Sequence, residues 1–366
     1  MSGLKGLKSL NYTDSYAYAV GRTKALEARM LDPARIQRIT EAPDYEEAVR
    51  YLADSEYSHM AGDTGFERAL EEERRRVHLT VASYSPDPYF TGLFFAAEDF
   101  LCLKSVIKEL FLKGKAAGAG ARKEKRVGWL GPDEVFSVAE AAYEDAPRDE
   151  EEMKLDFASA LKKLTGAGYV EYVLRDAAYR AAAAFRASED SLDIDITVDK
   201  AYFKYAVDIA SSRKASWLSG FIALKVDLVN VVMLMRAMNT GKGLAFLEKS
   251  MVEGGNIALK DLLEAHREGA SRLQKLLEAT NYWKVLSSGF EAWSRTSALR
   301  PFEMAAEGLL ASYARQSKQM SSGYEPVVGY LIAKDTEIAT LRKVLTGKSK
   351  RLAVPFIRER LSDGNA

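Results

Sequence analysis

Apolar residues recur at helical spacing along most of the chain, and no convincing alternation of apolar and polar residues predicts a strand. One stretch departs from the usual amphipathic pattern. Residues 220–242 are apolar on nearly all sides, yet they carry Asp227 in the middle and end in Gly241-Lys242. An ionised carboxylate on so apolar a helix needs a partner or water. The pattern therefore predicts an all-α protein with a polar group inside a buried helix.

This pattern occurs three times. Residues 92–115 and 329–348 resemble 220–242, with Asp99 and Glu337 in the place of Asp227. Each copy follows a helix that opens with an aromatic residue. The acids lie roughly 110–130 residues apart, a period that suits subdomains of several helices rather than a short solenoid repeat.

The repeat predicts three related helical units at 1–115, 129–240 and 241–366. A basic, Gly-containing linker at 116–128 separates the first two, and the third ends in a basic tail. A chain of 366 residues divided in this way is long enough to bury a substantial core.

Local signals predict several element boundaries. Asp32-Pro33 predicts the start of a short helix, and Asp44 with Glu47 predicts the start of a helix over 45–57. Residues 193–199 are expected to form a short extended or turn segment, and residues 259–277 are expected to form a helix.

Charge and cysteine content exclude some classes of function. Lys+Arg and Asp+Glu are both 52, which argues against a dominant nucleic-acid role, because such a role usually needs a basic excess. The single cysteine, Cys102, permits no internal disulfide and fits a reducing compartment.

Membrane insertion is also disfavoured. The first ten residues lack the apolar core of a signal peptide. The most apolar segment, 217–238, is interrupted by Lys225, Asp227 and Arg236, whose insertion would cost about 2.5–3.5 kcal/mol each. We therefore expect a buried helix there, and any association with a membrane to be peripheral.

Candidate chemistry is sparse. Thr346-Gly-Lys-Ser349 ends like a phosphate-binding loop, but Arg342 stands where that motif needs glycine, so Gly-Lys is interpreted as a helix C-cap. No metal-binding histidine pair or serine nucleophile motif is present, and Cys102 is expected to act as a small hydrophobe. We expect no catalytic residue, no metal, no cofactor and no small-molecule substrate.

The acid-bearing helices supply the candidate site. The residues considered for partner binding are Asp99, Lys104, Asp227, Asn230, Glu337 and Arg342. The favoured interpretation is a structural polar stripe, bonded to a neighbouring helix or facing a wet seam. A second is that three equivalent stripes line a central opening that receives another subunit, and catalysis is a third.

Two segments resemble a known family. Residues 16–31 (Tyr-Ala-Tyr-Ala-Val-Gly-Arg-Thr-Lys-Ala-Leu-Glu-Ala-Arg-Met-Leu), followed by 45–57, are similar to the opening of the C subunit of V/A-type rotary ATPases, which is equivalent to the d subunit of eukaryotic V-ATPases. Residues 329–348 resemble that family's closing helix. The family favours an amide three residues after the acid and a base at five, whereas here Cys102 and Thr340 replace the amide and Val232 replaces the base.

The resemblance implies an all-helical funnel of three subdomains with pseudo-threefold symmetry. Such a protein is not catalytic. It sits in the central stalk on the cytoplasmic side, peripheral to the membrane, and joins the rotating shaft subunits to the membrane rotor ring that carries protons or sodium ions. The alternatives are a helical-repeat scaffold that binds a peptide or RNA, and a helical-core hydrolase or lyase.

Overall fold

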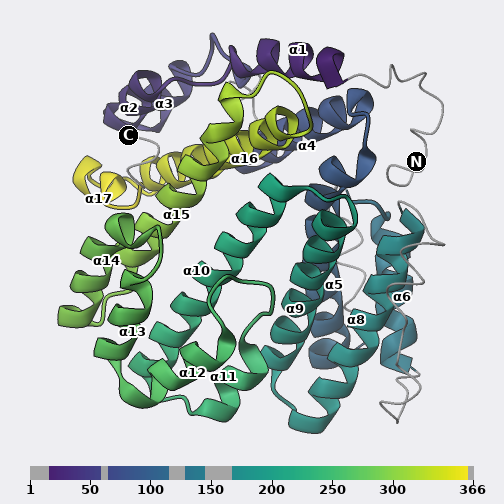
Figure 1. Ribbon diagram of the computed structural model, residues 1–366. Helices are drawn as coiled ribbons and strands as arrows, with labels where there is room; N and C mark the ends of the chain where they lie inside the picture. The colour runs from purple at the N-terminus through teal and green to yellow at the C-terminus, as the bar shows by residue number, and fades with distance from the viewer. Residues whose placement is uncertain (1–15, 59–64, 115–127, 145–166, 362–366) are drawn as a thin grey trace. The chain divides into compact units, whose positions relative to one another are not determined.

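The structure, a computed structural model, describes residues 16–58, 65–114, 128–144 and 167–361 (Figure 1). Within these ranges the chain forms helices and their connections, and no residue lies in a strand. The predicted all-α class is confirmed. The predicted linker at 116–128 lies outside the described residues except for Gly128.

Contacts divide the chain into two compact units. Among the described residues, the first unit comprises those of 87–222 and 249–254, and the second comprises those of 16–86, 223–248 and 255–361. The helices of the first unit are α5 (Pro88–Lys113), α6 (Pro132–Glu144), α8 (Ala167–Ser188) and α9 (Ser191–Ser212). Helix α5 packs against the other three, and α8 and α9 pair with each other.

The second unit contains the first four described helices and most of the helices after α9. Its N-terminal helices are α1 (Tyr16–Glu27), α2 (Pro33–Glu41), α3 (Tyr45–Arg50) and α4 (Phe66–Tyr84). Its later helices are α11 (Leu244–Ser250), α12 (Leu259–Glu268), α13 (Ala270–Glu278), α14 (Trp283–Thr296), α15 (Arg300–Arg315), the 3-10 helix η4 (Gln316–Gln319), α16 (Glu325–Ser349) and α17 (Val354–Arg358). Most of α10 (Ser216–Thr240) also belongs to it.

Short polar signals in the sequence start several of these helices. Asp32 accepts a hydrogen bond from the Arg35 amide at 2.8 Å and is followed by proline at the first helical position. Asp44 caps α3 in the same way through the Glu47 amide. These two predicted helix starts are confirmed.

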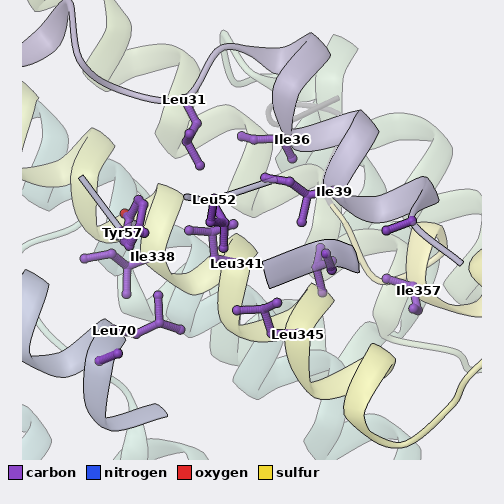
Figure 2. Packing of buried hydrophobic residues seen from close by; sticks show 14 residues of the cluster. Leu31, Ile36, Ile39, Leu52, Tyr57, Leu70, Ile338, Leu341, Leu345 and Ile357 are labelled. Atoms are coloured by element: carbon purple, nitrogen blue, oxygen red, sulfur yellow. The ribbon is translucent and has the colours of Figure 1, made fainter. Parts of the chain in front are cut away.

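Helix α16 is the centre of the second unit, because α1, α2, α3, α4, α15 and α17 all pack against it. Figure 2 shows its residues Ile338, Leu341 and Leu345 among aliphatic side chains of α2 and α4 and of the segment around Leu52. Each large apolar side chain buried here contributes roughly 1.5–3 kcal/mol, so this cluster holds α2 and α4 against α16.

The sequence-based expectations were wrong at three places. Residues 193–199, expected to form a short extended or turn segment, lie inside α9, which Asp190 caps. A single helix expected over 259–277 is broken at Gly269, whose φ of +88° disfavours other residues.

The third error concerns the end of α16. Gly347 is not a helix C-cap but lies inside the helix, where a Cβ would come within 2.7 Å of the Ile357 side chain. Arg351 takes the left-handed conformation that ends this helix, with φ +56°. Glycine is therefore needed at 347 for the close approach of α17.

Contacts group the helices differently from the sequence repeat. Of the first predicted repeat, 1–115, helices α1–α4 pack in the second compact unit and α5 in the first. The three-unit division and the funnel shape stay predictions.

Helix α10 is long and apolar enough to pass a length-and-composition test for a membrane span, alone among the described helices. Just over half of its most apolar window is buried within the protein, and core helices of soluble proteins pass the same test.

Candidate functional site: three buried carboxylates

Asp227 has no exposed surface and is held by the chain that follows α10. Its Oδ1 accepts a hydrogen bond from the Ile257 amide at 2.9 Å. Its Oδ2 accepts from the Asn256 side chain at 3.0 Å and from the Tyr282 hydroxyl at 2.8 Å. The carboxylate thus joins the middle of α10 to the residues that lead into α12 and α14.

Asp99, on α5, does the same in the first unit. It is 2% exposed and accepts from the Trp129 amide at 2.8 Å, with a longer contact of 3.4 Å from the Leu130 amide. The Trp129 indole also donates to the Gly92 carbonyl of α5 at 2.8 Å. These bonds join α5 to the residues that lead into α6.

Glu337, on α16, binds a segment far away in the sequence. Its Oε2 accepts from the Leu31 amide at 2.7 Å, and its Oε1 accepts from the Tyr57 hydroxyl at 2.7 Å. The Lys334 ammonium, 2% exposed, lies 2.8 Å from the same Oε1 and 3.5 Å from Glu73. The last long helix is therefore joined to the beginning of the chain.

The three arrangements are equivalent. In each, the acid binds the amide of a buried aliphatic residue, and a helix begins two residues after it. Those residues are Leu130 before α6, Ile257 before α12 and Leu31 before α2. Helices α5 and α10 thus hold the residues that lead into the next helices along the chain, α6 and α12. Helix α16 instead holds the residues that lead into α2, near the start of the described chain. We call these contacts the carboxylate anchors.

In two of the anchors a tyrosine hydroxyl also donates a hydrogen bond to the acid. Tyr57 follows Leu31 by about as many residues as Tyr282 follows Ile257, and each hydroxyl donates to the anchor acid. Burial first, and then the nearby carboxylate, raises the pKa of both tyrosines above the usual range. Both therefore stay neutral donors.

The length of the acid matches the space beside it. Gly128 and Gly255 stand two residues before the anchored aliphatic, and a Cβ there would lie 1.6 Å from Asp99 Oδ1 and 2.3 Å from Asp227 Oδ1. The third anchor has Arg29 at this position, and its acid is glutamate, one methylene longer. The two anchors with the shorter aspartate have glycine two residues before the anchored aliphatic residue. The anchor with the longer glutamate has arginine at that position.

Burial also affects the first anchor electrostatically. It raises the pKa of Asp99 well above its usual range, and the hydrogen bonds from the Trp129 and Leu130 amides oppose this rise. Beside the third anchor, on the same helix, the charges of His78 and Arg74 outweigh burial and hold the pKa of Asp335 below its usual range.

The other predicted site residues are arranged differently. Asn230 is 1% exposed, and the positions equivalent to it, Cys102 and Thr340, are buried too. Lys104 is partly exposed and lies 2.7 Å from Asp199 of α9, whereas Arg342 is 42% exposed and lies 3.6 Å from Glu71 of α4. The structure thus brings each acid to its own backbone partners and leaves the two bases nearer the surface. The partner-binding role of these residues stays a prediction.

Sequence reasoning missed the residues that complete the anchors. These are Leu31, Tyr57, Gly128, Trp129, Gly255, Ile257, Tyr282 and Lys334. One signal was available: the first two acids are followed, at nearly the same distance, by a glycine, an aliphatic residue and then a helix start.

The described part of the chain holds no cluster of three or more His, Cys, Asp or Glu side chains suited to a metal ion. Cys102 is a buried thiol. Each acid that the sequence singled out accepts hydrogen bonds from its own chain and joins helices of an all-α protein.

Comparison with known proteins identifies the family to which this helical protein belongs. The chain belongs to the ATP synthase (C/AC39) subunit family, whose model matches residues 19–360. It is therefore a subunit of the rotary ATPase type, and the family resemblance seen in the sequence is confirmed.

Its similarity to individual relatives is low but covers their length. It is 26% identical to the C subunit of the A-type ATP synthase of Methanothermobacter thermautotrophicus, over 91% of this chain and 84% of that protein. The corresponding protein of Methanocaldococcus jannaschii is 22% identical over 94% and 86%. That of Thermococcus gammatolerans is 24% identical over 99% and 92%.

Proposed function

We propose that the protein is a non-catalytic central-stalk subunit of a V/A-type rotary ATPase. In this role it couples the rotating shaft subunits of the soluble ATPase sector to the membrane rotor ring, which transports protons or sodium ions. It works on the cytoplasmic side, peripheral to the membrane. The observation that carries this proposal is the family match over residues 19–360.

The carboxylate anchors suit such a role. A coupling protein that transmits torque must resist deformation between its two docking faces. Each anchor fixes the start of a helical segment to the middle of a long helix through two or more hydrogen bonds to a buried carboxylate. Hydrogen bonds in a buried, low-dielectric site are stronger than those exposed to water, so these joints favour a stiff body.

Reconstitution tests the proposal. The soluble ATPase sector with its shaft is combined with rotor ring and stator in vesicles, with and without this chain. We expect ATP hydrolysis in both preparations, and ATP-driven ion transport only when the chain is present. Ion transport of equal rate without the chain, or ATP hydrolysis by the purified chain, would contradict the proposal.

The two partly exposed bases provide a residue-level test of partner binding. Arg342→Glu and Lys104→Glu change surface charge while leaving the buried acids in place. If these bases face the shaft, each variant should bind purified shaft subunits about threefold to tenfold more weakly, with a reduced salt dependence. Exposed Arg68, paired with Glu72 on α4, gives the matched control Arg68→Glu.

The comparisons lend no support to the alternative of a helical-repeat scaffold for a peptide or RNA. The reconstitution separates the two, since a general scaffold would leave ion transport unchanged.

A further inference from the structure

Three basic side chains around α17 have no partner among the described residues. Lys350, Arg351 and Arg360 are exposed, and their side chains make no hydrogen bond or ion pair with any residue that the structure describes. The neighbouring Arg358 differs, because it is paired with Glu41 of α2. The three unpaired bases fall within a segment of 11 residues, 350–360, so they concentrate positive charge on this part of the second unit.

An exposed aromatic ring lies in the same segment. Phe356, on α17, is 61% exposed and is the most exposed large apolar side chain among the described residues. The next residue, Ile357, is 1% exposed and belongs to the apolar cluster of Figure 2. Helix α17 thus turns Ile357 inward and leaves Phe356 in solvent. A single exposed apolar residue is ordinary by itself. Here its position among unpaired bases is informative.

The backbone holds this segment against the end of α16. Arg351 takes a left-handed conformation, with φ +56°, which residues other than glycine rarely adopt. The Leu352 amide donates to the Gly347 carbonyl of α16 at 2.9 Å, and the chain then turns back into α17. Hydrogen bonds of a helical turn continue past the end of α17. Residues four apart on such a turn are neighbours, so Arg360 lies on the same side as Phe356.

One acid accompanies these bases. Glu359 lies in the same segment and lines a groove between α14 and α15. The segment keeps an excess of positive charge even when Glu359 is counted. An anionic partner is therefore favoured. We call the four exposed side chains the basic aromatic patch: Lys350, Arg351, Phe356 and Arg360.

We propose that the basic aromatic patch contacts the headgroup region of a membrane that contains anionic phospholipid. The ammonium and the two guanidinium groups pair with lipid phosphates, and the Phe356 ring enters the boundary between headgroups and acyl chains. This inference rests on the proposed function, which brings the chain to the surface of the membrane that holds the rotor ring. It deepens that function by assigning a contact with the lipid itself.

The chemistry of the patch favours a membrane over an acidic protein surface. Each Lys or Arg near an anionic bilayer strengthens binding by about fivefold, and apolar or aromatic side chains beside such bases anchor a protein in the interface. An acidic protein surface must place fixed carboxylates opposite each base. Lipid headgroups instead move to meet the bases, which suits three long side chains that no described residue holds in place.

Vesicle binding tests the role of the charges. The purified full chain is sedimented with vesicles of phosphatidylcholine, or of equal parts of phosphatidylcholine and phosphatidylglycerol. We expect binding only to the vesicles with phosphatidylglycerol, and weaker binding as salt is added. Replacing Lys350→Gln and Arg351→Gln together should weaken this binding by about fivefold for each charge removed.

The matched control removes two exposed bases elsewhere in the second unit, with Lys275→Gln on α13 and Lys284→Gln on α14. This variant should bind like the original chain, and circular dichroism of both variants shows that the helices are retained. Equal binding to the two kinds of vesicle, or equal binding by the two double variants, would overturn the inference.

A fluorescent probe tests the contact in the assembled complex. Phe356→Cys is labelled with the NBD fluorophore, and the complex is reconstituted in phosphatidylglycerol vesicles whose lipids carry a doxyl quencher. The native Cys102 is buried and should not be labelled. Val285→Cys, at an exposed apolar position of α14, is the matched control. We expect the quencher to dim the probe at position 356 and to leave the probe at 285 unchanged.

The outcomes separate this inference from the proposed function. A chain that does not join the rotary complex contradicts the proposed function. A chain that joins the complex while an acidic protein shields position 356 from the lipid quencher overturns the membrane contact alone.

Discussion

The Leu31 amide donates a 2.7 Å hydrogen bond to Glu337, a residue 306 positions further along the chain. Leu31 precedes α2, and Glu337 lies in the middle of α16, the last long helix. The chain therefore closes on itself within the second unit through the same type of contact that Asp227 makes with Ile257. Helices α1–α4 and α16 therefore form one packed body.

Removing the closing acid should destabilise the second unit severely. In Glu337→Ala the Leu31 amide and the Tyr57 hydroxyl lose their acceptor, and the buried Lys334 loses its nearest counter-charge. Breaking a buried ion pair by removing one partner costs about 3–5 kcal/mol. We expect a loss of this size in urea unfolding, with faster hydrogen exchange in peptides from α2 and α16.

Two further variants calibrate this result. Tyr57→Phe removes one hydrogen bond and should cost about 1 kcal/mol. Glu278→Ala, which removes an exposed acid bonded to Gln274, should change stability by less than about 0.5 kcal/mol. A Glu337→Ala protein as stable as Glu278→Ala would show that the third anchor contributes little.

The two anchor glycines should not tolerate a methyl group. In Gly255→Ala the new Cβ would lie 2.3 Å from Asp227 Oδ1, and in Gly128→Ala it would lie 1.6 Å from Asp99 Oδ1. The carboxylate must move, and overpacking of this kind costs about 1–3 kcal/mol. Thermal unfolding of both variants should shift to lower temperature.

Gly243→Ala is the matched control, because nothing lies within 4 Å of a Cβ built there and its φ is not positive. Replacing such a glycine reduces the entropy of the unfolded chain, so stability should stay equal or rise by about 0.4–1 kcal/mol. Equal destabilisation by all three alanines would exclude the steric explanation.

Much of the fold follows from local sequence signals. The helical periodicity predicts the all-α class, and Asp32-Pro33 and Asp44 mark two helix starts that the structure confirms. These signals act over a few residues, because a cap needs only its own side chain and an amide two or three positions later. The extended or turn segment wrongly expected at 193–199 shows their limit, since burial within the first unit overrides the local preference of its β-branched residues and aspartates.

The candidate site could be predicted only in part. The repeat identifies Asp99, Asp227 and Glu337 as unusual, and the need of a buried carboxylate for a partner follows from physical chemistry. The identity of the partner does not follow, because the Leu31 amide and the Tyr57 hydroxyl are brought to Glu337 by tertiary packing across hundreds of residues. Periodicity places a side chain on a helix face but says nothing of which distant backbone covers that face.

The first unit should lose stability as pH rises. Burial raises the pKa of Asp99 above that of the unfolded chain, about 3.9, so the folded state holds a proton that the unfolded state has released. The contribution of this group is therefore fully present below the unfolded pKa and is lost as pH rises through the folded pKa. Asp99→Asn, which cannot titrate, should lack this part of the pH dependence.

Carbon-13 NMR of the labelled Asp99 carboxyl measures this directly, and urea unfolding between pH 4 and pH 8 measures its effect on stability. The expected result is a titration midpoint above the ordinary aspartate value and a steeper decline with pH in the original protein than in Asp99→Asn. A midpoint below that value would mean that the amide hydrogen bonds outweigh burial, and the sign of the pH dependence would reverse.

Exchanging the lengths of the acids should destabilise two anchors for opposite reasons. Asp227→Glu adds a methylene at a site with no exposed surface, against Gly255, and overpacking there costs about 1–3 kcal/mol. Asp227→Asn keeps the length and an acceptor for the Ile257 amide, so it should be the milder change. Glu337→Asp shortens the side chain, so it cannot reach the Leu31 amide and the Tyr57 hydroxyl together, and each buried group left without a partner costs about 1–3 kcal/mol.

Urea unfolding of the three variants separates length from charge, because Asp227→Glu and Glu337→Asp keep the charge and Asp227→Asn does not. If Asp227→Asn is the least stable of the three, charge rather than fit determines the strength of the anchors.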